Sequence, residues 1–120
     1  MKTPRRTIVA VIDDDELVLD ALEDLVESAG HTVMAFQSGP NLLEGGRLSE
    51  IDRLITDIGM PLIDGFELRR VARSRRPELP VILITGRHDI AAQRPAAGIA
   101  DRLFLKPLDG RARLAVIGGQ

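Results

Sequence analysis

Five polar residues of this sequence each stand where a short apolar run ends, and their side-chain types complement one another chemically. They are Asp13, Asp14, Asp57, Thr85 and Lys106. Carboxylates held close together repel one another, which raises the pKa of at least one of them when no cation is present. A hard divalent cation such as Mg²⁺ takes oxygen ligands and usually keeps several waters, which leaves a position for a phosphate oxygen. With an ammonium group, a hydroxyl group and a carboxylate nucleophile, the set is suited to phosphoryl transfer.

Asp57 is the candidate nucleophile, because it is the single carboxylate at the end of its apolar run. Gly59, Pro61 and the pair Asp64-Gly65 follow it and predict a loop. An Asp at such a place can also serve only to cap a turn, so its chemical role depends on the other polar residues lying beside it. Gly59 and Gly86 would let a phosphoryl group approach the backbone closely, although turn geometry alone also explains both.

The polar residues can meet only if the apolar runs before them are strands of one sheet. The pattern predicts five strands, at Ile8–Ile12, Thr32–Phe36, Arg53–Asp57, Pro80–Ile84 and Leu103–Leu105. It predicts helices between them, one that follows the acids after Ile12 and ends at Gly30, then Ser38–Glu44, Phe66–Ser74 and a short last helix from Asp109 to Ile117. Pro95 makes residues 87–100 weakly helical at best.

Strands that alternate with helices predict right-handed crossovers and a parallel sheet that is covered on both faces. In such sheets the functional site lies outside the carboxyl ends of the strands, which is where all five polar residues stand. The helix after the first strand is predicted to turn an apolar stripe inward, made of Val18, Ala21, Leu22, Leu25 and Ala29.

Composition limits the class of protein. With 120 residues, 44% of them hydrophobic, and a net charge of -2, the chain is predicted to be one globular domain over residues 1–120. There is no cysteine, and no apolar stretch is long enough for a membrane span or a signal peptide, so a cytoplasmic location is predicted. Three Phe with no Tyr or Trp argue against nucleic-acid binding by base stacking.

Four motifs together resemble those of response-regulator receiver domains, and they extend over nearly the whole chain. They are the string VIDDDE from Val11, the string LITDIGMPLIDG from Leu54, and the pairs Thr85-Gly86 and Lys106-Pro107. The resemblance implies an α/β, flavodoxin-like fold, a doubly wound five-stranded parallel sheet of order 2-1-3-4-5 with helices on both faces. It also implies that Asp57 accepts a phosphoryl group from a sensor histidine kinase or a histidine phosphotransfer protein.

The resemblance assigns a role to each site residue. Asp13, Asp14, Asp57 and the carbonyl of Gly59 would hold Mg²⁺, whereas Thr85 and Lys106 would contact the acyl phosphate. The peptide between Lys106 and Pro107 would be cis. Of the three consecutive acids, the first two are chosen because they stand at the strand end, whereas Asp15 is expected to cap the helix that follows.

Two features depart from the family pattern. The position three residues before Lys106, usually aromatic in this family, is Leu103, and the neighbouring Phe104 is expected to point to the other face of the sheet. The segment between Thr85 and Lys106 is slightly short and contains Pro95. The resemblance therefore implies an intact phosphorylation site with a weakened relay to the output face. The alternative is a one-residue shift of the strand that lets Phe104 replace the missing aromatic side chain.

Two other functions compete with a phosphorylation-dependent switch. A phosphatase of the haloacid-dehalogenase type also has Asp-x-Asp after a strand, as in Asp13–Asp15, but the chain is too short for its insertions and Asp57 would have no role. An inert receiver-like module would require the altered output face to outweigh the complete site. The predicted function is therefore a switch rather than an enzyme that acts on other substrates. The switch is expected to catalyse its own phosphotransfer and dephosphorylation. It is either a stand-alone receiver or one domain of a longer regulator.

Overall fold

The computed structural model describes residues 7–86 and 103–106, together with residues 108, 110, 113 and 116. Five strands form one parallel sheet in the order β2-β1-β3-β4-β5. Their bounds are β1 Ile8–Ile12, β2 Thr32–Phe36, β3 Arg53–Asp57, β4 Val81–Thr85 and β5 Leu103–Leu105. The predicted fold class and strand order are confirmed, and only β4 differs, because it begins and ends one residue later than predicted.

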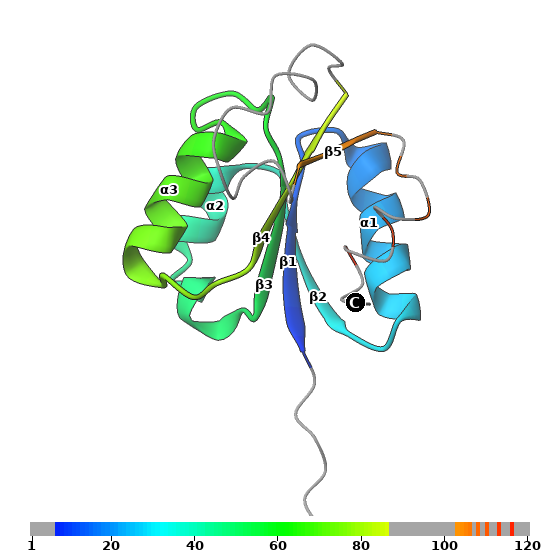
Figure 1. Ribbon diagram of the computed structural model, residues 1–120, viewed down its shortest axis with the longest axis horizontal. Coiled ribbons are helices and arrows are strands. Elements are labelled where there is room, and N and C mark those ends of the chain that lie inside the picture. The colour runs from blue at the N-terminus through cyan, green and yellow to red at the C-terminus, as the bar shows by residue number, and fades with distance from the viewer. Residues whose placement is uncertain are drawn as a thin grey trace, which may run out of the picture.

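Helices cover both faces of the sheet (Figure 1). Helix α1 (Glu16–Ser28) lies on one face, whereas α2 (Gly39–Glu44) and α3 (Gly65–Arg75) lie on the other. A short 3-10 helix, η1 (Arg47–Glu50), follows α2 and was not predicted. Residues 110, 113 and 116 are helical, but most of the predicted last helix, residues 87–102 and Pro107 lie outside the described residues. The predicted weak helix and the predicted cis peptide therefore remain predictions.

Side chains of the central strands are buried on both faces, which explains why these strands read as continuous apolar runs. In β1, Ala10 and Ile12 pack in the cluster beneath α2 and α3, whereas Val9 and Val11 pack in the cluster beneath α1. Each strand is therefore held from two sides, and its carboxyl end is fixed in space. Within the described residues, no helix is long and apolar enough to cross a membrane.

Helix α1 begins where the sequence predicts, but its buried stripe is rotated. The Asp15 carboxylate accepts a hydrogen bond of 3.0 Å from the Leu17 amide, which confirms Asp15 as the cap. The buried residues are Leu19, Leu22 and Val26, with Val18 and Leu25 half-buried, whereas Ala21 and Ala29 are exposed. The predicted stripe was wrong at these alanines, because turning the larger Leu and Val side chains inward removes more apolar area from water.

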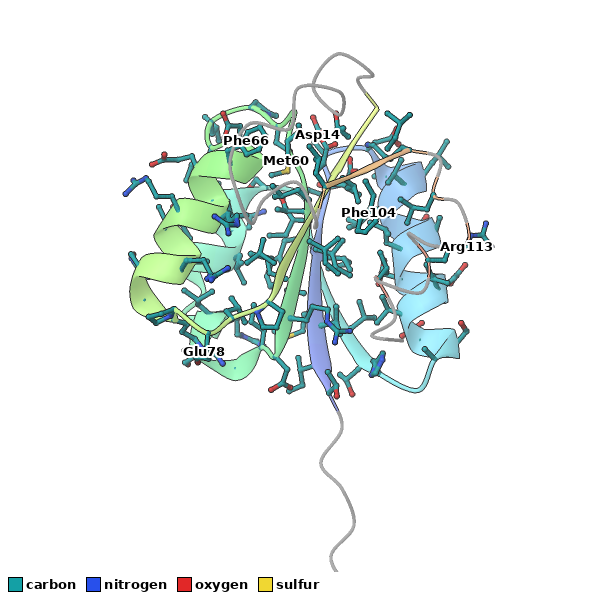
Figure 2. All side chains as sticks on the ribbon, viewed as in Figure 1. Asp14, Met60, Phe66, Glu78, Phe104 and Arg113 are labelled. Atoms are coloured by element: carbon teal, nitrogen blue, oxygen red, sulfur yellow. The ribbon has the colours of Figure 1, made fainter. Side chains whose placement is uncertain are left out.

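Strand β5 places the side chains of Leu103 and Phe104 on opposite faces of the sheet. Leu103 packs in the cluster beneath α3, and Phe104 packs in the cluster beneath α1 (Figure 2). In the register with β4, Leu103 pairs with Leu83 and Phe104 pairs with Ile84. The predicted orientation of Phe104 is confirmed, and the alternative of a one-residue shift is wrong because Phe104 would then face the other layer.

Candidate functional site

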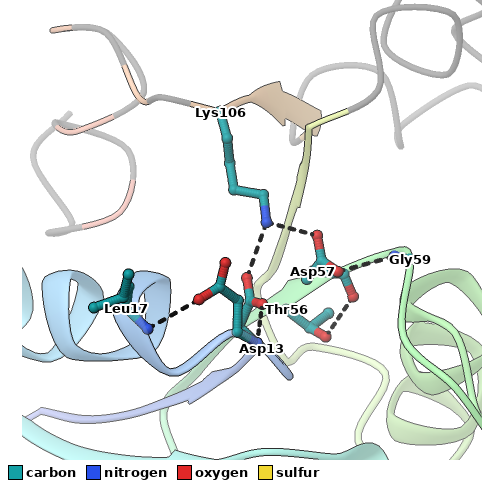
Figure 3. A network of polar contacts seen from close by, with 7 residues as sticks. Asp13, Leu17, Thr56, Asp57, Gly59 and Lys106 are labelled. Carbon is teal, nitrogen blue, oxygen red and sulfur yellow. Dashed lines mark hydrogen bonds and ion pairs between the residues drawn. The ribbon is translucent and has the colours of Figure 1, made fainter.

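The carboxyl ends of β3 and β4 and the residues that follow β1 and β5 meet at one edge of the sheet. Carboxylate oxygens of Asp13, Asp14 and Asp57 all lie within 4.8 Å of one another. The Lys106 ammonium group bridges two of them, with Nζ 3.1 Å from Asp13 Oδ2 and 3.1 Å from Asp57 Oδ1 (Figure 3). Thr85 is buried at the end of β4, and its carbonyl accepts a 2.7 Å hydrogen bond from the Lys106 amide. The structure thus brings the predicted residues to one edge.

Asp13 is fixed by the turn that leads from β1 into α1. Its amide donates to the Phe36 carbonyl of β2 at 3.2 Å, and its Oδ1 accepts from the Asp15 amide at 2.9 Å. The Asp13 residue is fully buried, whereas the neighbouring Asp14 is exposed. Of the two consecutive acids, one is therefore a rigid part of the fold and the other faces solvent beside it.

Asp57 is held through both carboxylate oxygens. Oδ1 contacts Lys106, and Oδ2 accepts a hydrogen bond of 3.1 Å from the Gly59 amide. Asp57 is buried except for 6% of its surface. Gly59 is exposed, and among the described residues a Cβ atom there would meet Asp57 Oδ2, at 3.6 Å. The carboxylate is therefore oriented by the loop that follows β3, with no side chain at position 59 to cover it.

The start of helix α3 presses on the backbone of Asp57. A Cβ atom at Gly65 would lie 2.6 Å from the Asp57 carbonyl oxygen and 2.7 Å from Ile58 Cα, closer than real Cβ contacts allow. The Gly65 amide donates to the Ile58 carbonyl at 3.1 Å, and the Asp64 carboxylate caps the helix by accepting from the Glu67 amide at 2.8 Å. Glycine at position 65 is thus required for space rather than for an unusual backbone angle.

The charges of the cluster do not balance. Among the described residues, three carboxylates face one ammonium group, which leaves two negative charges without a partner in this part of the chain. Burial raises the pKa of the Asp13 carboxyl, and the charge of Asp57 adds to this, although the Asp15 amide and Lys106 oppose it. Burial by itself would lower the pKa of Lys106, but its hydrogen bonds to Asp13 and Asp57 and their charges outweigh burial and raise it. Lys106 is therefore held in its charged form.

This donor set fits Mg²⁺. All three candidate side-chain ligands are carboxylates, which supply the hard oxygen atoms that Mg²⁺ prefers, and a divalent cation would neutralise the two negative charges that have no partner among the described residues. The Gly59 carbonyl remains the predicted fourth protein ligand. The Lys106 ammonium group forms ion pairs with carboxylate oxygens of Asp13 and Asp57. The ammonium group and a bound cation would therefore compete for the same negative charge.

Sequence reasoning did not identify two residues that contact Asp57. Thr56 is fully buried, and its hydroxyl group donates to the Asp57 carbonyl at 2.9 Å. Gly65 was interpreted as a turn residue, whereas it lies against the Asp57 backbone. A hydroxyl residue inside an apolar run was the available signal for Thr56. No sequence signal could have located Gly65, because its contact depends on how α3 packs.

Comparison with known proteins gives a consistent family. The family model for the response regulator receiver domain matches residues 9–117. The chain is 34% identical over 115 residues to the response regulator protein TodT of Pseudomonas putida, which covers 94% of this chain and 50% of TodT. It is 35% identical over 116 residues to the transcriptional regulatory protein FixJ of Azorhizobium caulinodans, which covers 95% of this chain and 54% of FixJ. The chain thus spans about half the length of these curated relatives.

Solved structures agree with this assignment. A response regulator receiver domain protein from Clostridium thermocellum superposes with a TM-score of 0.77 at 27% identity, over 93% of this chain and 91% of that one. The family match, the strand order and the acidic cluster at the carboxyl edge of the sheet all agree. The chain therefore belongs to the response regulator receiver domain family of two-component signalling.

Proposed function

We propose that Asp57 is the phosphoacceptor of this receiver domain and that it accepts the phosphoryl group with Mg²⁺ bound at Asp13, Asp14 and Asp57. The observation that carries the proposal is the position of the Asp57 carboxylate. It lies against the Lys106 ammonium group on one oxygen and the Gly59 amide on the other, within 4.8 Å of the two other acids. A carboxylate held in this way is oriented for in-line attack before the substrate arrives.

In the proposed reaction, a carboxylate oxygen of Asp57 attacks the phosphorus atom of a phosphohistidine. The P–N bond breaks, and the imidazole nitrogen keeps its electron pair. Bound Mg²⁺ supplies charge that offsets the negative charge of the phosphoryl oxygens. Lys106 supplies a second positive charge beside Asp57, and the proposed role of the Thr85 hydroxyl is to donate to the phosphoryl group. Later hydrolysis by water returns the Asp57 carboxylate, so that the switch resets itself.

The phosphodonor is proposed to be a protein, namely a sensor histidine kinase or a histidine phosphotransfer protein. Among the residues that the structure describes, the exposed large apolar side chains are Leu17, 80% exposed, and Leu62, 85% exposed. Leu17 lies in the first turn of α1 after the acid pair, and Leu62 lies in the loop that follows Asp57. Each follows an acid of the cluster by a few residues along the chain, so we propose that a docking protein buries them. Residues 1–120 are proposed to form one receiver domain.

Intact-mass measurement after incubation with acetyl phosphate and Mg²⁺ tests the proposal. We expect one phosphoryl group on the wild-type chain, and none with Asp57→Asn, with EDTA, or with Asp13→Asn combined with Asp14→Asn. Asp20→Asn, on the exposed side of α1, is the matched control and should be labelled like the wild type. Labelling that persists in Asp57→Asn, or in EDTA, would contradict the assignment. The haloacid-dehalogenase alternative instead predicts labelling at Asp13.

A further inference from the structure

Thr56 is a buried hydroxyl residue that the packing of the core does not require. It is fully buried next to the end of β3, where it pairs with Ile12 of β1 and Leu83 of β4. Both neighbours are apolar and belong to the cluster beneath α2 and α3. Valine has the same shape and an equally high strand preference, and it would avoid the cost of burying a hydroxyl group. The hydroxyl group therefore has a role other than filling space.

The hydroxyl group of Thr56 donates to the main-chain carbonyl of Asp57, at 2.9 Å (Figure 3). The register between β1 and β3 ends at the pair of Ile12 and Thr56, so this carbonyl lies just beyond their ladder. The same oxygen faces Gly65, whose missing Cβ would approach it to 2.6 Å. The Asp57 carbonyl is thus held between the Thr56 hydroxyl group and the first residue of α3.

Fixing this carbonyl fixes the peptide plane between Asp57 and Ile58. The Ile58 amide on the other side of that plane donates to the Ile84 carbonyl at 3.0 Å. A peptide plane held at both its oxygen and its nitrogen cannot rotate, because both groups are hydrogen-bonded in a buried place. Because that plane contains the Asp57 Cα atom, holding it limits how far the Cα–Cβ bond, and with it the carboxylate, can move.

We propose that Thr56 is a positioning residue for the phosphoacceptor, which acts by holding the Asp57–Ile58 peptide plane and does not touch the phosphoryl group. The inference rests on the proposed role of Asp57. It predicts that loss of the hydroxyl group slows phosphorylation even while the protein stays folded. A net hydrogen bond of ordinary strength corresponds to about a fivefold to tenfold change.

Two pairs of variants separate positioning from stability. Thr56→Val replaces the hydroxyl group with a methyl group of similar size. Thr56→Ser keeps the hydroxyl group and removes the methyl group. We expect Thr56→Val to lose urea stability, because the buried Asp57 carbonyl loses its donor, and to react with acetyl phosphate and saturating Mg²⁺ about fivefold to tenfold more slowly. We expect Thr56→Ser to lose stability, because it leaves a void in the core, yet to react at nearly the wild-type rate. Thr56→Ala and Thr56→Ser form a second pair that differ only in the hydroxyl group.

The ¹⁵N shift of the Ile58 amide provides a readout that needs no phosphorylation. Because this nitrogen shares a peptide bond with the Asp57 carbonyl, its shift should change in Thr56→Val and Thr56→Ala and return in Thr56→Ser. Rates that follow urea stability across the four proteins would overturn the positioning role, as would a wild-type rate in Thr56→Val. If the wild type is not labelled on Asp57, the proposed function fails instead, and the Ile58 shift still decides whether Thr56 holds the peptide.

Discussion

Replacing Lys106 with Met should strengthen Mg²⁺ binding while weakening the metal-free fold. The substitution keeps most of the aliphatic stem and removes the ammonium group that lies 3.1 Å from Asp13 Oδ2 and 3.1 Å from Asp57 Oδ1. A cation bound to the same carboxylates would lie roughly 4 Å from that ammonium group. In water, two unit charges at this distance interact by about 1 kcal/mol, so an ammonium group repels a divalent cation by about 2 kcal/mol.

A change of about 2 kcal/mol corresponds to roughly thirtyfold tighter Mg²⁺ binding in Lys106→Met. The site is partly buried, which weakens screening, so this value is a lower limit. Without metal the variant should lose roughly 2 kcal/mol of unfolding free energy, because Asp13, whose side chain is 1% exposed, keeps a buried charge without its partner. Added Mg²⁺ should restore that stability, since a ligand that binds only the folded state stabilises it.

Calorimetric titration at fixed ionic strength measures the affinity, because the sequence has no tryptophan to report binding. Arg70→Met is the matched control. It removes one positive charge from the exposed side of α3, where Arg70 pairs with Glu67. Unchanged or weaker Mg²⁺ binding in Lys106→Met would refute the competition. An equal gain in Arg70→Met would show that overall charge, rather than this contact, controls affinity.

Two further predictions follow from the same edge of the sheet. Gly65→Ala should destabilise the fold by about 3 kcal/mol and weaken Mg²⁺ binding, because the new Cβ would push the Asp57 backbone. Gly39→Ala is the control for urea unfolding and Mg²⁺ titration, because its Cβ would first meet a Leu68 methyl group at 3.4 Å. Equal losses of stability and Mg²⁺ affinity in the two variants would contradict the argument. The pKa of Lys106 is raised in the folded protein, so the charged Lys106 side chain should stabilise the metal-free protein. This stabilisation should be complete below about pH 10, and it should be lost as the pH rises through the folded-state pKa. Urea unfolding of the wild type should show this loss of stability, and Lys106→Met should lack it. Few other side chains titrate in this pH range, because the sequence holds one other lysine and neither tyrosine nor cysteine.

The strands and the list of polar residues could be predicted from the sequence because both depend on local pattern. A run such as Ile8–Ile12 needs burial on both faces, and in a parallel sheet that requirement gives an uninterrupted apolar stretch. The acids that follow it cannot continue into the core, so they mark the strand end. The alternation of strands and helices then places Asp13, Asp57 and Lys106 on one edge. The strand order was predicted from the motifs, because they resemble those of receiver domains and that resemblance implies the order 2-1-3-4-5.

Other features were decided by packing between elements distant in sequence. The buried stripe of α1 was misplaced at Ala21 and Ala29, because their spacing fits the helix period but the sheet buries the larger side chains beside them. The register between β4 and β5 determined which layer receives Phe104.

The chemical groups that reach the site can be read from the sequence, because residue type and strand ends are local properties. The way in which those groups are held depends on contacts between elements that are distant in the chain. Lys106 meets Asp13 across 93 positions of the chain, and Gly65 closes on the Asp57 carbonyl from the start of another helix. Such contacts depend on distances of a few tenths of an ångström between packed elements, and close packing sets those distances only once the whole core is assembled.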